Sequence, residues 1–210
     1  MNRLETIASF VPVGSIVADV GTDHGLLPVM LIEQQRSPKV YAIDNKPGPL
    51  RSAYAMTKSM PQITLVLADG IQGLAEDVDT IVIAGLGGRT IVDILAVIPS
   101  RITTIIISAH VAMPLVRKSL HALGYAIDAE SLIEEAGEFY EMARFIQGQV
   151  SYTDADYYLG PLLRLERSDV WTRWLEQWIA QTKYTLKQIP ANDEKALEYQ
   201  ARLSLLQNEQ

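Results

Sequence analysis

The stretch IVADVGTDHG, from Ile16 to Gly25, decides how the rest of the chain is interpreted. It is an apolar run that ends in Asp19, turns at Gly21 and then offers a second acid and a histidine. Ligands of open parallel sheets bind in the crevice beyond the carboxyl ends of the strands, so we expect Asp19 and its turn to open onto that crevice. Gly21 allows close approach of the backbone, and the amides and helix N-terminus that follow suit a ligand's carboxylate. A dinucleotide pyrophosphate is disfavoured, because the G-x-G-x-x-G fingerprint is absent.

Three further apolar runs end in an acid or in glycines. They are Val40 to Ile43 before Asp44, Ile63 to Ala68 before Asp69-Gly70, and Thr80 to Ala84 before Gly85-Leu86-Gly87-Gly88. A carboxylate at Asp44, about twenty residues beyond the first glycine turn, suits a ribose diol. We expect Asp69 to accept a hydrogen bond from an adenine amino group while apolar neighbours sandwich the ring. The glycines let a ligand approach the backbone, although a tight strand-to-helix turn would also use them.

Composition limits the class of protein. The chain has 210 residues, 48% of them hydrophobic, which is enough for one large domain and an appendage. It has no cysteine, so disulfide scaffolds and thiolate metal sites are excluded, and no metal site is expected from its three histidines. Residues 1–10 do not resemble a signal peptide, and no apolar run is long enough to span a bilayer. We therefore expect a cytoplasmic protein without a membrane partner.

Strands alternate with segments of helical spacing, which indicates an α/β protein with a mainly parallel sheet. The expected strands are 15–19, 40–44, 63–68, 80–84 and 103–108, and the expected helices are 26–35, 49–60, 89–98 and 114–123. Two more extended stretches, 125–133 and 139–147, predict an antiparallel pair at one sheet edge. We place a first domain at residues 1–150 and a second at residues 151–210.

The second domain is predicted to be a helical hairpin. Apolar positions three or four residues apart mark a helix over 169–188, and its stripe holds Trp171, Trp174, Trp178, Thr182, Leu186 and Ile189. A second helix runs to about residue 208, with an expected apolar seam at Leu197, Ala201, Leu205 and Asn208. Packing of the hairpin explains the three tryptophans, and stacking on bases is the alternative.

These residues together resemble the bacterial tRNA (adenine-22-N1)-methyltransferase family. The matching pieces span nearly the whole chain in the family's order: Arg3-Leu4, Ala18 to His24, Asp44, Gly48-Pro49-Leu50, Asp69-Gly70, Ile83 to Gly88, Tyr140-Glu141 and Leu159-Gly160-Pro161. The resemblance implies a Rossmann-like class I methyltransferase sheet followed by a coiled-coil-like helical domain. It also implies S-adenosyl-L-methionine as cofactor, held by Asp19, Gly21, Asp23, His24, Asp44, Asp69, Gly70, Ala84 and Gly85.

The reaction that the family carries out needs no general base before transfer, because adenine N1 has a lone pair and no proton. The enzyme's share is positioning, exclusion of water and stabilisation of the cation that forms. We assign Asp23 as a carboxylate that faces the acceptor, with His24 beside it; a purely loop-fixing role is the alternative for His24. Where the family usually has Gln-Pro-Asn, this chain has Ser108-Ala109-His110, so His110 is expected to take the place of the asparagine.

Charge is the difficulty for an RNA partner. The formal net charge is −7, whereas phosphate neutralisation supplies much of the affinity for RNA. The expected substrate contacts are Gly87, Gly88 and Arg89, with Arg117 and Lys118 nearby, and a mild basic face of the hairpin at Arg164, Arg167 and Arg173. An ordinary solvated helix surface explains that face equally well. Two alternatives to a tRNA methyltransferase stay open: a methyltransferase that acts on a small molecule or a protein, and a module that binds the cofactor or RNA without catalysis. We expect a monomer.

Overall fold

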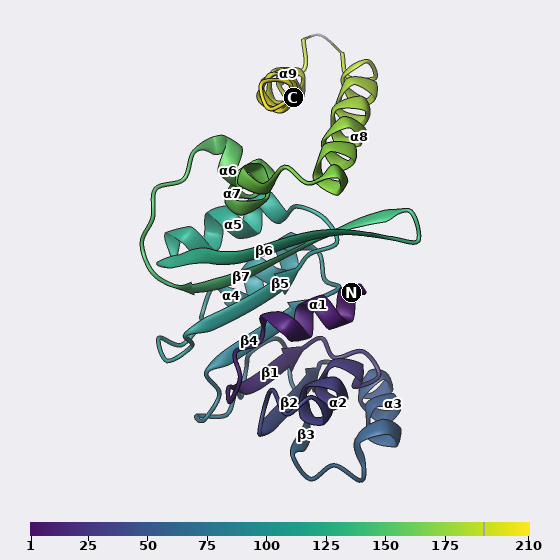
Figure 1. Cartoon of the computed structure of the whole chain (residues 1–210), viewed down its shortest axis with the longest axis vertical. Helices are drawn as coiled ribbons and strands as arrows, with labels where there is room; N and C mark the ends of the chain where they lie inside the picture. The colour runs from purple at the N-terminus through teal and green to yellow at the C-terminus, as the bar shows by residue number, and fades with distance from the viewer. Residues whose placement is uncertain (191) are drawn as a thin grey trace. The chain divides into compact units, whose positions relative to one another are not determined.

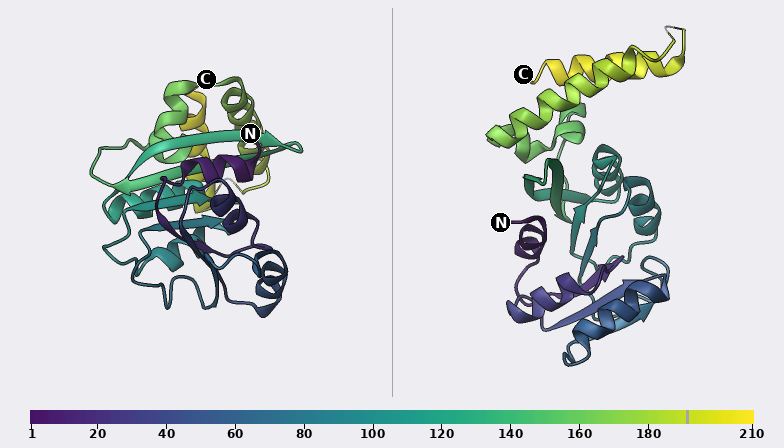
Figure 2. Two further views of the ribbon diagram at one scale, coloured as in Figure 1. Left: turned by 60° about the horizontal axis from the view of Figure 1, so that its bottom comes forward. Right: turned by 90° about the vertical axis from the view of Figure 1, so that its right-hand side faces the viewer.

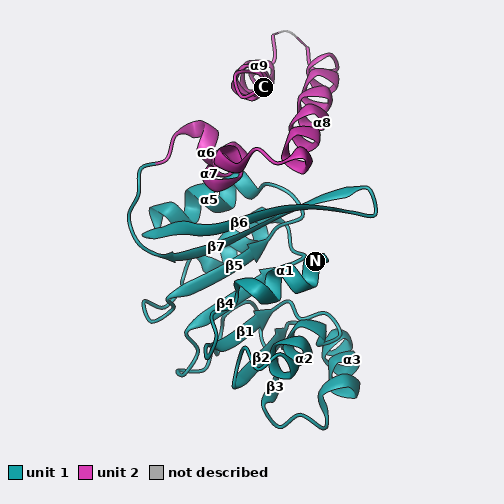
Figure 3. Cartoon of the chain, viewed as in Figure 1, with its two compact units in different colours: residues 1–151 teal, residues 152–210 magenta. Residues whose placement is uncertain are grey.

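The computed structural model describes residues 1–190 and 192–210, and these form two compact units. Unit 1 comprises Met1–Ser151 and unit 2 comprises Tyr152–Gln210 (Figure 3). Among the described residues no helix is both long and apolar enough to cross a membrane. Each unit is described by itself below.

Unit 1 is built from seven strands and five helices. The strands are β1 (Ile16–Val20), β2 (Lys39–Asp44), β3 (Ile63–Leu67), β4 (Thr80–Ala84), β5 (Thr104–Ser108), β6 (Tyr125–Glu135) and β7 (Glu138–Gln147). The helices are α1 (Arg3–Phe10), α2 (Leu26–Glu33), α3 (Pro47–Thr57), α4 (Gly88–Leu95) and α5 (Met113–Ala122). The predicted alternation is confirmed, and the ends of its elements lie within a few residues of the expected ones.

The strands form one sheet in the order β3-β2-β1-β4-β5-β7-β6 (Figure 1). All pairs from β3 to β5 are parallel, whereas β5 with β7 and β7 with β6 are antiparallel. The predicted mainly parallel sheet with an antiparallel edge is therefore confirmed. The chain moves outward from β1 to β3 and then returns to β4 on the other side of β1. The topological switch point, where α/β sheets bind ligands, thus lies between β1 and β4.

Right-handed crossovers explain how the helices are divided between the two faces of the sheet. The order runs in opposite directions in the two halves, so right-handed connections place their helices on opposite faces. In accordance with this, α2 contacts both α1 and α3, and α4 contacts α5 (Figure 2). Strands β1, β4 and β5 are almost entirely buried on both faces, as expected of a parallel sheet covered by helices, and β2 is half-buried at Lys39, Tyr41 and Asp44.

The antiparallel edge holds a buried ion cluster that was not predicted from the sequence. Arg117 on α5 was expected in an exposed basic patch, but its side chain is only 1% exposed. It pairs with Glu130 of β6 at 2.9 Å and with Glu141 of β7 at 2.8 Å. The expectation was wrong because these carboxylates are distant in sequence and become partners only when the edge strands pack on α5. Lys118, the next residue, is exposed.

The first helix, α1, was not expected and is fixed by residues from the other end of unit 1. Its cap is a capping box, in which Asn2 and Glu5 each accept a hydrogen bond from the other's backbone N–H. The Arg3 backbone N–H donates to Glu135 at 3.0 Å, and its guanidinium lies over the Tyr140 ring. Arg144 of β7 donates to the Phe10 carbonyl. Helix α1 therefore packs on the strands that end the unit.

The described residues of unit 2 form four helices, α6 (Asp154–Leu159), α7 (Pro161–Glu166), α8 (Asp169–Leu186) and α9 (Glu194–Gln207), and α8 and α9 pack as a hairpin. The predicted stripe of α8 is confirmed, with Trp171, Trp174 and Thr182 buried. The predicted seam of α9 is wrong, because Leu197 is 70% exposed and Ala201 and Asn208 are exposed too. The buried or half-buried positions are Ala196, Tyr199, Arg202, Leu203, Leu205 and Leu206. Arg202 covers this side because its guanidinium lies over the rings of Tyr158 and Tyr199.

Candidate functional site

A cavity of about 300 Å³ lies beyond the carboxyl ends of the central strands, at the switch point. Its lining comes from the ends of β1 and β2, from the loops after β1, β2, β3 and β4, from the first turn of α3 and from both turns of α4. The lining residues are Val20, Gly21, Ile43, Asp44, Asn45, Lys46, Pro49, Ala68, Asp69, Gly70, Leu86, Thr90 and Ile94. Of the predicted cofactor residues, Gly21, Asp44, Asp69 and Gly70 therefore meet in one cavity.

The loop after β1 has the backbone conformation that the glycine predicts. Gly21 has φ of +80°, a backbone angle that residues other than glycine rarely adopt. The Leu86 side chain lies 3.5 Å from where a Cβ on Gly21 would be. The expected use of the next amides is partly wrong. The N–H groups of Gly21 and Thr22 donate to the Ile43 carbonyl at 2.8 and 3.0 Å, so they hold the loop to β2 and are not available to a ligand.

Asp19 lies at the end of β1 and is buried, with an exposed fraction of 5%. Burial raises the pKa of its carboxyl from 3.8 to about 6, and the nearby carboxylates of Asp23 and Asp44 add to the rise. The nearby Thr22 hydroxyl lowers the pKa of Asp19 and so reduces this rise. This buried hydroxyl nevertheless forms no well-aligned hydrogen bond among the described residues. A carboxylate kept from water beside two others favours a cationic ligand group, such as an ammonium.

Asp23 and His24 lie outside the cavity lining. Their side chains are 84% and 60% exposed, and His24 Nε2 is 3.3 Å from Asp23 Oδ1. His24 has φ of +55°, an unusual value for a residue with a side chain, and Gly25 follows in the same left-handed region as the N-cap of α2. The two exposed side chains therefore project from a sharply turned loop and are not part of the cavity wall.

The loops after β2 and β3 are joined by side-chain hydrogen bonds. Asp44 Oδ1 accepts from the Lys46 N–H at 2.7 Å, which leaves its other oxygen for a ligand. The Asn45 side-chain amide donates to Asp69 Oδ1 at 3.3 Å across the cavity wall. Asn45 and Lys46 were not predicted as lining residues, because they follow the acid that ends β2 and no pattern in the sequence marks them.

The loop after β4 brings the unusual Ser108-Ala109-His110 segment next to the predicted glycines. Gly85 has φ of +84°, and a Cβ on it would lie 3.7 Å from His110 Nε2. The Gly85 N–H donates to the Ser108 carbonyl, and the His110 N–H donates to the Leu86 carbonyl, each at 3.0 Å. His110 thus lies at the β4 end of the site, whereas Ala84, the last residue of β4, is half-buried and outside the cavity lining.

The paired glycines at the start of α4 differ from each other. A Cβ on Gly88 would lie 2.7 and 2.8 Å from the carbonyl oxygens of Ala112 and Val111, so a side chain cannot be accommodated there without movement of the backbone. A Cβ on Gly87 meets nothing within 4 Å. Gly88 therefore has a packing role, and Arg89 after it is exposed.

The predicted basic face of the hairpin is largely neutralised within unit 2. Arg164 pairs with Asp156 and Glu209, and Arg167 pairs with Glu209 at 3.0 Å while its guanidinium lies over the Trp171 ring. Arg173 is exposed on α8. The sequence did not predict this neutralisation, because Glu209 lies more than 40 residues beyond Arg164 and Arg167 in the chain. In the part of the chain that the structure describes, no cluster of acidic or histidine side chains has the arrangement of a metal site.

Known proteins resemble this chain both in sequence and in structure. Residues 1–143 match the family model described as "Methyltransferase domain". The tRNA (adenine(22)-N(1))-methyltransferase of Bacillus subtilis is 27% identical over 97% of this chain and 94% of its own length. A crystal structure of a putative tRNA (m1A22) methyltransferase from Streptococcus pneumoniae is 32% identical, with a TM-score of 0.91 over 100% of this chain and 98% of its own.

A second crystal structure of the Streptococcus pneumoniae protein is in complex with S-adenosyl-L-methionine. It is 30% identical to this chain and has a TM-score of 0.90, covering 99% of this chain and 97% of its own. The likeness therefore extends through both units, and is not confined to the sheet. The chain belongs to the methyltransferase domain family and, within it, to the tRNA (adenine-22-N1)-methyltransferases.

Proposed function

We propose that this protein transfers a methyl group from S-adenosyl-L-methionine to N1 of adenosine 22 in tRNA. The observation that carries the proposal is the cavity at the switch point, where Asp44 and Asp69 end neighbouring strands and face one space. The similarity to the relatives in Bacillus subtilis and Streptococcus pneumoniae supports the choice of tRNA as the acceptor. Such a substrate places the reaction in the cytoplasm.

The described residues fit S-adenosyl-L-methionine in charge and in shape. Asp44 is suited to a ribose diol, because one carboxylate oxygen is free of the Lys46 amide. Asp69 is suited to the adenine amino group, with Leu86 and Ile94 as apolar walls. Asp19, buried and beside two further carboxylates, is suited to the ammonium of the methionine part. When bound, the cofactor supplies an electrophilic methyl group on its sulfonium sulfur.

The chain's own share of the reaction is positioning and electrostatics. Adenine N1 attacks with a lone pair and releases no proton, so no residue needs to act as base before transfer. The ring gains a positive charge, and an oriented carboxylate stabilises that charge as it develops. We assign this role to Asp23, whose exposed carboxylate lies beside His24 in the loop after β1. His110, near Gly85, is assigned to contact with the base.

The two units receive different parts of the work in this proposal. Residues 1–150 would hold the cofactor, the reacting base and most of the phosphate contacts, because Arg164 and Arg167 of residues 151–210 are already paired with Asp156 and Glu209. Arg89, exposed at the start of α4 and next to the lining residue Thr90, is a candidate for the first phosphate contact near the reacting base.

The test is methyl transfer from labelled S-adenosyl-L-methionine to unmodified bacterial tRNA, followed by nucleoside analysis. We expect 1-methyladenosine in a transcript with A22 and none in a matched transcript with G22. Asp23→Ala should abolish transfer while S-adenosylhomocysteine affinity, measured by calorimetry, is kept. Equal methylation of both transcripts would contradict the position, and labelled protein or metabolite with unlabelled tRNA would contradict the acceptor.

A further inference from the structure

Three cations without an ion-pair partner among the described residues lie in α3 or at its two ends. Residues 45–68, which include α3, contain Lys46, Arg51 and Lys58 and not a single aspartate or glutamate. The whole chain, in contrast, has 25 acidic against 18 basic residues. Among the described residues none of these three side chains takes part in an ion pair, so their charge is available to a ligand.

Two of these cations, Arg51 and Lys58, lie along one side of α3 together with a tyrosine. Arg51, Tyr54 and Lys58 follow one another at intervals of three and four residues, which are neighbouring positions on a helix surface. We call these three residues the α3 stripe. Tyr54 is 61% exposed, and its ring is therefore open to a stacking partner. Lys58 is the C-cap residue, so the stripe extends from the middle of the helix to its end.

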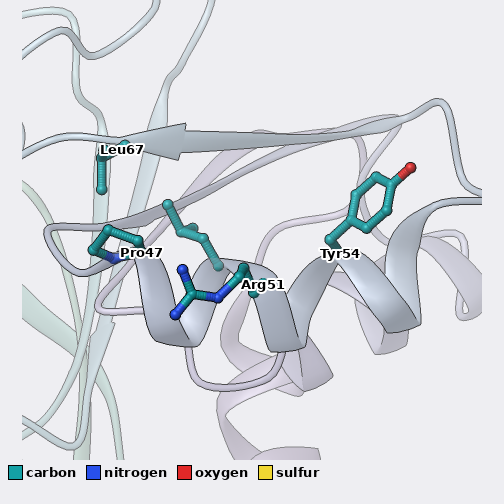
Figure 4. A pocket seen from close by; sticks show the side chains of 5 residues that line it. Pro47, Arg51, Tyr54 and Leu67 are labelled. Carbon is teal, nitrogen blue, oxygen red and sulfur yellow. The ribbon is translucent and has the colours of Figure 1, made fainter.

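An open depression of about 460 Å³ accompanies the stripe. It is lined by Pro47, Leu50, Arg51 and Tyr54 of α3 and by Leu67 at the end of β3. Figure 4 shows the α3 side chains projecting from successive turns, with Leu67 coming from the neighbouring strand. A cation and an aromatic ring thus share the border of one shallow, mainly apolar hollow. That combination is typical of surfaces that hold single-stranded nucleic acid, where bases stack on aromatic rings and phosphates meet cations.

The depression lies next to the cofactor cavity. Lys46 and Pro49 line the cavity, while Pro47 and Leu50 line the depression, so the first turn of α3 separates the two spaces. A polynucleotide whose reacting base enters the site can therefore continue over α3. The hairpin is less suited to phosphate contact through Arg164 and Arg167, because Asp156 and Glu209 already neutralise them.

We propose that the α3 stripe is a tRNA-binding surface, in which Arg51 and Lys58 contact phosphates and Tyr54 stacks on an unpaired base. This proposal rests on the proposed function, since it assigns a surface for the tRNA of that reaction. An acidic peptide would satisfy the two cations equally well but gains nothing from a flat base-stacking ring. RNA is therefore the occupant that uses all three residues.

Two matched pairs of variants test the proposal. Arg51→Gln with Lys58→Gln removes two charges from the stripe, and Lys183→Gln with Lys187→Gln removes two from exposed positions of the hairpin. Tyr54→Leu removes the ring, and Tyr184→Leu removes a ring of similar exposure, 68%, from α8. Lys46 is left unchanged because it lines the cofactor cavity. For each variant we would measure the Kd for unmodified tRNA over a range of salt concentrations and the Kd for S-adenosylhomocysteine.

We expect the charge variant of the stripe to weaken tRNA binding about tenfold or more and to reduce the slope of log K against log salt by about two, roughly one for each lost phosphate contact. Tyr54→Leu should weaken binding roughly fivefold or more with an unchanged slope, because stacking is not electrostatic. Affinity for S-adenosylhomocysteine should remain that of the wild type.

Equal effects of the hairpin and the stripe charge variants would overturn the proposal, as would wild-type affinity of the stripe variants. These results leave the proposed function intact as long as wild-type protein forms 1-methyladenosine at position 22. If wild-type protein neither binds nor methylates tRNA, the proposed function fails and the assignment of the stripe fails with it. A stripe variant that binds an acidic peptide less well but tRNA normally would assign the surface to a protein partner instead.

Discussion

The buried carboxyl of Asp19 should lower the stability of unit 1 at neutral pH. Its pKa is 3.8 in the unfolded chain and about 6 in the folded protein. Between these values the unfolded chain has released the proton while the folded protein retains it, so stability falls as the pH rises from about 4 to about 6 and stays low above that. At about 1.4 kcal/mol per pKa unit, the cost at pH 7 is about 3 kcal/mol.

Asp19→Asn removes the charge and should remove this cost. The free energy of unfolding of the variant, relative to wild type, should increase by about 3 kcal/mol between acid and neutral pH. All three tryptophans lie in α8, so tryptophan fluorescence reports on unit 2 and the unfolding of unit 1 has to be followed by far-ultraviolet circular dichroism. Asp93→Asn, the same change at an exposed position of α4, is the control and should show no such trend.

The same residue links stability to binding. The ammonium of S-adenosylhomocysteine favours the ionised form of Asp19, so wild-type affinity should rise as the pH passes about 6, and the affinity of Asp19→Asn should be lower and flat over that range. A stability difference between variant and wild type that does not change with pH would refute the reasoning, because burial would then not penalise the charge. Stabilisation together with lost affinity is the expected compromise of a binding site.

Three further predictions concern packing and charge. Gly88→Ala should cost about 1–3 kcal/mol of stability, because its Cβ meets two backbone carbonyls, and Gly87→Ala should be neutral by comparison in thermal unfolding. Arg117→Met should cost about 3–5 kcal/mol of stability at neutral pH, because it leaves Glu130 and Glu141 without a compensating charge. The loss should be smaller at acid pH, because burial raises the pKa of Glu141. Denaturant titration at both pH values measures the loss, and a value below about 1 kcal/mol at neutral pH would argue against this account. Asp44→Asn should weaken S-adenosylhomocysteine binding about tenfold while an amide oxygen still accepts from the Lys46 N–H, and unchanged affinity in calorimetry would remove Asp44 from the cofactor site.

The strands and the cavity could be predicted because both depend on local sequence. Apolar runs that end in Asp44, Asp69 or a glycine mark the carboxyl ends of parallel strands, and topology then brings these ends together. The positive φ values of Gly21 and Gly85 follow from residue type in the same way. The cavity is therefore assembled from short-range signals and one rule of sheet architecture.

Properties that depend on partners distant in the sequence were not predictable. Arg117 resembles an exposed helix residue until Glu130 and Glu141 surround it, and Arg164 and Arg167 resemble free cations until Glu209 returns to them. The seam of α9 was missed for a related reason. The periodicity of α9 is compatible with burial of either of two neighbouring faces. The buried face is the one on which Arg202 lies over two tyrosine rings, and no local pattern in the sequence predicts that contact.

The attachment of α1 to the last strands of unit 1 has a consequence for synthesis of the chain. Arg3 bonds to Glu135, and Phe10 to Arg144, so these two bonds of the first helix form only after about two thirds of the protein has left the ribosome. Contacts of such long sequence separation slow folding, since the loop between them has to close first. Until then the core that Ile7 and Val11 join is incomplete, because Met142 of β7 belongs to it beside Leu27 and Leu31 of α2. The nascent N-terminus should therefore be held less firmly than in the finished protein, and deletion of β6 and β7 should make it more accessible to proteases.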